Sequence, residues 1–138
     1  MRKFIVASHG YMAKGLVHTA EMVLGKLENL KYICAYVDEG KPFEESIRDT
    51  IEGMEEGDEI IIMTDIYGGS VCNTFLSYIN NKQIYQVAGM NLPLLIELVT
   101  NPLEDTKELI RQAVAKARAS ICEPAAMMID LTAAAEEF

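Results

Sequence analysis

The run from Glu59 to Thr64, "EIIIMT", constrains the fold of this chain more than any other stretch. Three consecutive isoleucines and a methionine stand together, without the alternation of polar and apolar residues that a half-exposed strand shows. β-branched residues favour extended backbone, and an unbroken apolar run is typical of a parallel strand that helices cover on both faces. The run therefore predicts a buried strand in a parallel sheet.

Extended and helical patterns alternate along the rest of the chain. Further strands are predicted at 4–7, 32–37 and 84–88, with a last one at 126–131. Helices are predicted at 12–27, 42–54, 68–79 and 105–118, and another begins at 91–93. This β-α order predicts one doubly wound α/β domain over residues 1–138, with a mostly parallel four-stranded sheet and helices on both faces.

Composition excludes several classes of protein. The net charge is −9 with no basic patch, which argues against a nucleic-acid partner. No apolar run reaches the roughly 20 residues that span a bilayer, and the one after Lys3 is too short for a signal peptide. Cys34, Cys72 and Cys122 show no CxxC spacing, which favours a reducing compartment. A cytoplasmic protein is therefore expected.

Polar residues stand where two of the predicted strands end. His9 follows the first strand, Asp65 follows the third, and Gly68, Gly69 and Ser70 come just after Asp65. Ligands bind at the carboxyl ends of strands in such folds, so these residues meet at one edge if the strands are neighbours. Two glycines before a helix let backbone N–H groups approach an anion such as a phosphoryl group. Neither a P-loop nor a GxGxxG motif is present.

His9 is a candidate nucleophile toward phosphorus. A carboxylate that accepts the N–H of one imidazole nitrogen leaves the lone pair of the other nitrogen directed outward, and Asp65 is predicted to be that carboxylate. Residues 1–20 contain no Asp or Glu although the chain is acidic overall. A phosphoryl dianion approaching His9 would therefore meet little repulsion apart from that of Asp65.

Each of these residues also has a plainer interpretation. His9 alone would more often be a turn residue, Asp65 would cap the next helix, and the two glycines would form an ordinary tight turn. His18 falls on the polar face of the first helix, where no catalytic role is expected. Cys72 is more simply a buried thiol than a reactive one.

Four stretches together resemble a known family. They are "SHGYMAKGL" at 8–16, "TAEMVLG" at 19–25, "TDIYGGSVCN" at 64–73 and "AGMNLPLLIEL" at 88–98. Their order and spacing are similar to those of the IIA phosphocarrier domain in the mannose/fructose/sorbose family of the bacterial phosphoenolpyruvate-dependent sugar phosphotransferase system. The resemblance extends from Phe4 to about residue 120.

The resemblance implies a phosphotransferase role for specific residues. His9 would accept a phosphoryl group from the carrier HPr and pass it to a histidine of the cognate IIB protein, with the membrane subunits IIC and IID as indirect partners. Asp65 would orient His9, and Gly68, Gly69, Ser70 and Val71 would bind the phosphoryl group. No metal or other cofactor is expected at this step.

The chain departs from the family pattern in the segment after Asp65. Ile66 stands where the family often has Thr, Tyr67 where it often has Trp, and Val71 where it often has Pro. The loss of a hydroxyl at Ile66 removes one expected phosphoryl contact but leaves the nucleophile in place.

The resemblance also implies a homodimer. Residues 121–131 would form an antiparallel strand exchanged onto the partner's sheet, and 132–138 a frayed tail. No fused IIB domain follows, so a stand-alone subunit is expected.

Three other functions stay open at this point. A hydrolase could be built from Ser70, His9 and Asp65, but no G-x-S-x-G elbow is present. Ser70 also follows Asp65 too closely in the sequence for a histidine to bridge the two comfortably. The related phosphocarrier of a dihydroxyacetone kinase system is a nearer alternative. A regulatory module controlled by phosphorylation of His9 is the third. The transported sugar is not encoded here, because sugar specificity is expected to reside in the membrane subunits.

Overall fold

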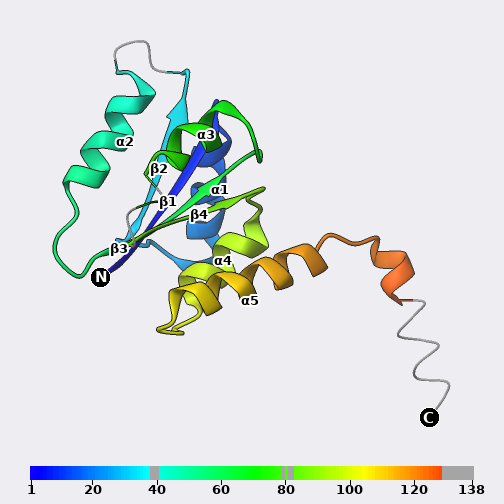
Figure 1. Cartoon of the computed structure of the whole chain (residues 1–138). Helices are drawn as coiled ribbons and strands as arrows, with labels where there is room; N and C mark the ends of the chain where they lie inside the picture. The colour runs from blue at the N-terminus through cyan, green and yellow to red at the C-terminus, as the bar shows by residue number, and fades with distance from the viewer. Residues whose placement is uncertain (38–40, 79, 81–82, 129–138) are drawn as a thin grey trace.

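The computed structural model describes residues 1–37, 41–78, 80 and 83–128 (Figure 1). The strands are β1 (Arg2–His9), β2 (Leu30–Ala35), β3 (Glu59–Thr64) and β4 (Ile84–Ala88). The helices are α1 (Met12–Leu24), α2 (Phe43–Glu52), α3 (Ser70–Leu76), α4 (Leu92–Thr100) and α5 (Thr106–Ala119).

The four strands form one parallel sheet in the order β2-β1-β3-β4. β1 and β3 are therefore central neighbours, with Ala7 opposite Thr64, and β1 pairs on its other side with β2, with His9 opposite Ala35. The predicted doubly wound parallel sheet is confirmed. Because all strands point the same way, the ends of β1, β2 and β3 meet at one edge.

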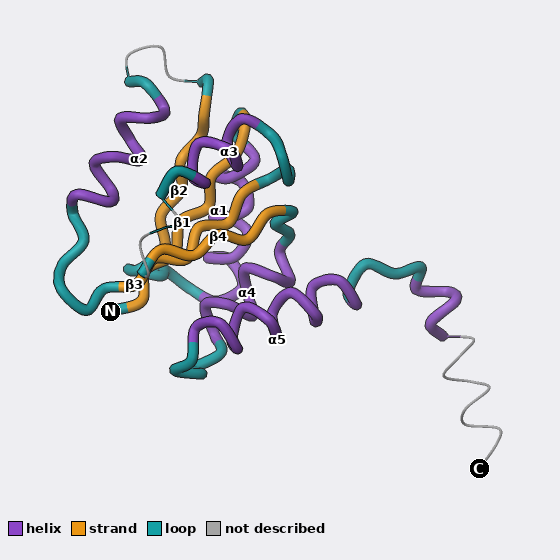
Figure 2. The backbone as a smooth tube through the Cα atoms, in the orientation of Figure 1, coloured by secondary structure: helices purple, strands orange, loops and turns teal. Residues whose placement is uncertain are grey.

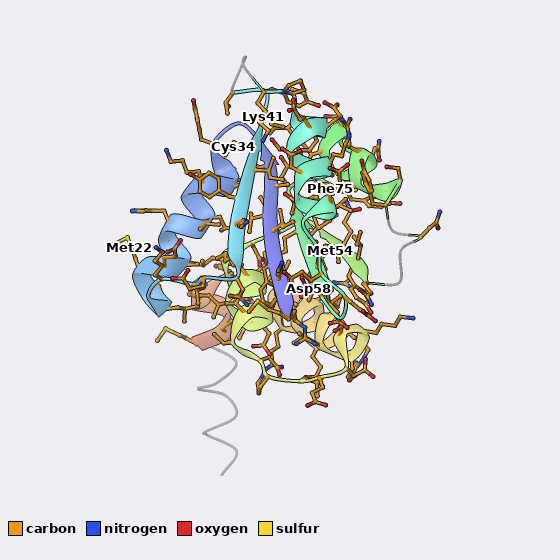
Figure 3. All side chains as sticks on the ribbon, turned by 90° about the vertical axis from the view of Figure 1, so that its left-hand side faces the viewer. Met22, Cys34, Lys41, Met54, Asp58 and Phe75 are labelled. Carbon is orange, nitrogen blue, oxygen red and sulfur yellow. The ribbon has the colours of Figure 1, made fainter. Side chains whose placement is uncertain are left out.

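Helices cover both faces of this sheet (Figure 2). Along β1, Phe4 and Val6 pack in the cluster that includes residues of α1, α4 and α5, whereas Ile5 and Ala7 pack in the cluster that includes residues of α2 and α3. Figure 3 shows α1, which carries Met22, and α3, which carries Phe75, on opposite sides of the strands. The side chains of residues 60–63 in β3 have no exposed surface, which explains why their run is apolar without alternation.

Element ends differ from the predicted ones by a few residues. β2 ends at Ala35 rather than residue 37, and α1 ends at Leu24 rather than residue 27. The helix predicted at 68–79 is shorter, since α3 covers Ser70–Leu76 and residue 79 lies outside the described residues. The first of these differences matters most, because it releases Tyr36 from the strand.

The C-terminal strand predicted at 126–131 is not present in the described residues. After α5 the chain leaves the body of the molecule (Figure 1), and residues 124–128 form a short helical turn. The strand prediction is wrong for 126–128 in this single chain, where no neighbouring strand supplies hydrogen-bond partners. Residues 129–131 and the predicted tail at 132–138 lie outside the described residues.

Candidate functional site

The carboxyl edge of the sheet brings together four side chains from distant parts of the sequence. His9 is the last residue of β1, Asp65 directly follows β3, Tyr36 directly follows β2, and Ser70 is the first residue of α3. The neighbouring positions of β2, β1 and β3 in the sheet place the first three side by side. The site is therefore a direct consequence of the strand order.

Asp65 holds both the backbone and the ring of His9. Its Oδ2 accepts the backbone N–H of His9 at 2.8 Å and lies 2.8 Å from Nδ1, while Oδ1 accepts the N–H of Ile66 at 2.9 Å. The carboxylate is 7% exposed, and this burial raises the pKa of Asp65. The hydrogen bonds from His9 and Ile66 outweigh burial, so the pKa lies below its ordinary value. An ionised Asp65 accepts only, so Nδ1 carries the single proton of the neutral imidazole and Nε2 keeps its lone pair.

The free nitrogen of His9 faces Ser70. Nε2 lies 3.0 Å from Ser70 Oγ, which in turn lies 2.9 Å from the hydroxyl oxygen of Tyr36. The rings of His9 and Tyr36 are 5.6 Å apart and inclined at 40°. The His9 side chain is 41% exposed, so an incoming group reaches Nε2 from solvent.

The residues on each side of His9 explain the sequence Ser8-His9-Gly10. The buried Ser8 Oγ accepts the N–H of Ala13 at 2.8 Å, which ties the end of β1 to the first turn of α1. Gly10 has φ +59°, a left-handed conformation that glycine adopts without strain, and donates its N–H to Ala35 O at 3.0 Å. The chain thus stays extended through His9, turns sharply at Gly10 directly after it, and presents the His9 side chain at the end of the strand.

The segment between Asp65 and α3 forms the other wall of the site. Gly68 has φ +78°, so this turn favours glycine, and its carbonyl accepts the side-chain amide of Asn73 at 3.1 Å. A Cβ on Gly69 would lie 3.4 Å from His9 Cε1 and 3.3 Å from Ile66 O. Gly69 therefore provides room beside the imidazole.

The backbone donors of this wall are not equivalent. The N–H of Gly69 donates to Ile66 O at 3.2 Å, so Gly69 contributes space rather than a donor here. Ser70 and Val71 belong to the first turn of α3, where a helix offers its N–H groups no internal acceptor. The side chain of Val71 is buried, so it does not contact an incoming group.

A comparison with known families decides the relationship. The model of the family EIIA-man, described as "PTS system fructose IIA component", matches residues 3–116. The chain belongs to the EIIA-man family.

Relatives agree with this assignment. The "PTS system mannose-specific EIIAB component" of Escherichia coli K12 is 29% identical over 121 residues, which are 85% of this chain and 38% of that protein. The "PTS system fructose-specific EIIA component" of Bacillus subtilis is 28% identical over 102 residues, 72% of this chain and 70% of that protein. The chain thus spans well under half the length of the E. coli relative.

Solved structures share the fold. A Klebsiella pneumoniae protein described as a "putative phosphoenolpyruvate-dependent sugar phosphotransferase system (PTS) permease" superposes with a TM-score of 0.82 at 36% identity, over 88% of this chain and 90% of that one. The PTS IIA protein associated with the fucose utilization operon of Streptococcus pneumoniae gives 0.74 at 26% identity, over 92% and 96%. The α/β architecture described above is therefore that of the EIIA-man family.

The geometry corrects one argument from the sequence. Ser70 was expected to follow Asp65 too closely for a histidine to bridge them. In this EIIA-man member His9 bridges them, with contacts of 2.8 Å to Asp65 and 3.0 Å to Ser70. The tight turn at Gly68 makes this possible, because it reverses the chain between the two residues. The short separation of Asp65 and Ser70 in the sequence is therefore no argument against a hydrolase. The family assignment is what favours a phosphocarrier over a hydrolase.

Tyr36 is the site residue that the sequence analysis missed. The strand predicted at 32–37 would have placed it inside regular β structure, whereas it lies in a turn with φ +67°. Its position directly after a parallel strand is the one signal that would have pointed to it. His18, by contrast, is not part of this cluster and lies exposed on α1, on the polar face where the sequence placed it.

Two further properties concern the described residues only. They contain no group of three or more His, Cys, Asp and Glu side chains placed to hold a metal ion. None of their helices has the length and apolar character that crossing a bilayer requires.

Cys72 is buried, in agreement with the plainer interpretation of that thiol.

Proposed function

We propose that this chain is a IIA phosphocarrier in which Nε2 of His9 accepts a phosphoryl group from the phosphohistidine of HPr and passes it to a histidine of a cognate IIB protein. The observation that supports this most strongly is the pairing of Nδ1 with the buried Asp65 carboxylate at 2.8 Å. The pairing leaves the Nε2 lone pair available, and it stabilises the positive charge that the ring acquires when it is phosphorylated.

The transfer itself exchanges one nitrogen–phosphorus bond for another. The lone pair of Nε2 forms a bond to phosphorus, while the bond to the donor nitrogen breaks and its electron pair returns to the donor ring. Because both reactants and products are phosphohistidines, the free-energy change is small. The protein's contribution is alignment of the groups and stabilisation of charge.

The wall formed by the start of α3 supports binding of the phosphoryl group. The Ser70 hydroxyl lies beside Nε2, and the N–H groups of Ser70 and Val71 are donors for phosphoryl oxygens. Gly68 shapes the turn, and Gly69 keeps the space beside the imidazole open. Hydrogen bonds from these neutral donors would stabilise the negative charge of the phosphoryl group as it approaches His9.

The surface around His9 supports docking of protein partners. Four large apolar or aromatic side chains stand exposed near the site, and Tyr67 is 85% exposed. They are Tyr11, Met12, Ile66 and Tyr67. Exposed apolar groups beside a reacting residue are typical of surfaces that bind proteins. The proposal makes HPr and the IIB protein the direct partners, in the cytoplasm, and the IIC and IID subunits indirect ones.

The experiment uses enzyme I, HPr and phosphoenolpyruvate as the source of phosphoryl groups. The chain is expected to acquire acid-labile, base-stable phosphate, and His9→Ala is expected to acquire none. His18→Ala is the matched control, because it removes the other histidine of the chain, and it is expected to label normally. Labelling of a folded His9→Ala would overturn the proposal.

A hydrolase is the second candidate that an observation favours, since Ser70, His9 and Asp65 lie in hydrogen-bonded series. The two functions differ in the fate of the phosphoryl group. A carrier holds it until the cognate IIB protein is added, whereas a hydrolase releases inorganic phosphate on incubation alone. Discharge by a dihydroxyacetone kinase subunit in place of a IIB protein would instead assign the chain to that related system.

A further inference from the structure

Tyr36 is held in an unusual backbone conformation beside the site. Among the described residues it is the one non-glycine residue with positive φ, at +67°. Such a conformation costs an L residue free energy and persists where the surroundings hold it. Here the turn directs the ring to His9, 5.6 Å away, and to Phe43, 6.2 Å away. Phe43 is buried and packs edge-on against Phe75, so one side of Tyr36, which is otherwise 64% exposed, contacts a core residue.

The directions of the hydrogen bonds follow from the state of Asp65. The carboxylate accepts only, so in the neutral imidazole of His9 Nδ1 donates and Nε2 is an acceptor. Ser70 must therefore donate its single hydroxyl proton to Nε2. Its oxygen is then an acceptor, and the Tyr36 hydroxyl is the donor in their 2.9 Å contact. One ordered series runs from Tyr36 through Ser70 and His9 to Asp65.

We propose that Tyr36 is a positioning residue that acts on His9 through Ser70. Its hydroxyl anchors the Ser70 oxygen beside Nε2. In the resting protein the Ser70 proton covers the lone pair that attacks phosphorus, so that proton must turn away when the nitrogen–phosphorus bond forms. The Tyr36 hydroxyl donates to the Ser70 oxygen, so this hydrogen bond is unaffected when the Ser70 proton rotates away from Nε2. Ser70 can then donate to a phosphoryl oxygen from the same position.

The hydrogen-bond series in the resting protein is independent of any function. The turn of the Ser70 proton onto a phosphoryl oxygen rests on the proposed function. Without the Tyr36 hydroxyl, Ser70 Oγ would lose its anchor and leave the position beside Nε2 more often. We then expect a weaker hydrogen bond from Ser70 to Nε2 in the resting protein and a slower phosphoryl transfer.

The first measurement is a double-mutant cycle on phosphotransfer from phospho-HPr. Tyr36→Phe keeps the ring and removes only the hydroxyl, and we expect about a five-fold slower transfer, the scale of one neutral hydrogen bond. In the Ser70→Ala background the same change is expected to have no effect, because Tyr36 acts through Ser70. Tyr32→Phe is the matched control on the preceding strand and is expected to transfer at the wild-type rate. Equal slowing by Tyr36→Phe in both backgrounds would overturn the proposal.

The second measurement needs no phosphotransfer. The ¹⁵N resonance of His9 Nε2 reports the hydrogen bond that this nitrogen accepts. Ser70→Ala is expected to move it toward the value of a free imidazole nitrogen, Tyr36→Phe to move it part of the way, and Tyr32→Phe to leave it in place. No movement in Tyr36→Phe would refute the resting series. If the wild-type chain accepts no phosphoryl group, the proposed function fails while this resonance still decides the series.

Discussion

The two carboxylate oxygens of Asp65 make three contacts, and the contact with Nδ1 determines which ring nitrogen of His9 carries the proton. The carboxylate accepts backbone N–H groups from both His9 and Ile66 as well as the ring nitrogen. Its pKa lies below the ordinary value, so the carboxylate is ionised throughout the neutral range. The stability that these bonds contribute is present above the unfolded pKa of about 4, and it is lost as the pH falls through the lower folded value.

Asp65→Asn is expected to slow phosphotransfer about a hundredfold, a typical magnitude for a positioned proton-holding group. An amide has one oxygen, so it cannot accept from the two backbone groups and the ring together, and its N–H₂ turned toward Nδ1 favours the wrong tautomer. The rate is measured with phospho-HPr and then with the IIB protein. Asp49→Asn, in an exposed ion pair with Lys41, is the control and should leave both rates unchanged. Normal rates for a folded Asp65→Asn would exclude the proposed role.

The residues of the site differ in how far the sequence predicts them. His9 and Asp65 stand at the ends of clear apolar runs, so the parallel fold alone brings them together. Tyr36 follows a weaker strand whose end was placed two residues too late. Its role depends on a left-handed backbone and on a contact with Ser70, 34 residues away. Neither feature leaves a periodic pattern in the sequence.

At the scale of elements, the turn between β3 and α3 shapes one side of the site. Gly68 needs its positive φ, but Gly69 has φ −73° and ψ 167°, which any residue adopts. From the sequence, the two glycines were predicted to serve one purpose, the close approach of the backbone to an anion. The structure separates them: the first allows the turn, and the second leaves room beside His9.

Gly69→Val is therefore expected to fold and to transfer phosphate poorly. Its Cβ would lie 3.4 Å from His9 Cε1, and the added methyl groups would displace the ring or the incoming phosphoryl group. A misplacement of about 1 Å costs roughly a hundredfold in rate. Ser70→Ala should be milder, because the backbone donors remain. Circular dichroism reports the fold and phospho-HPr the rate.

The matched control for this substitution is Gly53→Val. Gly53 follows α2, and a Cβ there would approach only the Asp49 and Thr50 carbonyl oxygens, the nearer at 3.4 Å. It should leave the rate unchanged. Normal transfer by a folded Gly69→Val would mean that the phosphoryl group binds elsewhere.

At the scale of the whole molecule, the sheet has two open edges, at β2 and β4. A groove of about 340 Å³ lies beside β4. Its lining residues are Tyr67, Cys72, Leu76, Ile84, Tyr85, Gln86 and Ala88. Within the described part of the chain, Gln86 Oε1 is buried there without a hydrogen-bond partner. An added strand would cover this edge and could supply the missing donor.

The C-terminal segment has the composition of such a strand but not its conformation in this single chain. Residues 121–128 are exposed although they include Ile121 at 77% and Met128 at 68%. The sequence predicted a strand from this apolar character. A strand needs a neighbouring strand to pair its backbone groups. The segment leaves the body of its own chain, so it could form a strand only against a second chain.

We therefore expect a homodimer in which residues 121–131 cross to the partner's sheet, with Pro124 to one side of the paired part because it donates no hydrogen bond. Truncation after Ser120 should give a monomer or an aggregate, since it uncovers an apolar sheet edge. Sedimentation of the full chain and of the truncated one at micromolar concentration measures the change. Cys122→Ser, which alters the same segment without shortening it, should stay dimeric. Because residues 9, 36, 65 and 70 come from one chain, the truncated protein should still accept a phosphoryl group if it stays folded. A monomeric full chain, or a dimer that survives the truncation, would show that this segment does not join two subunits.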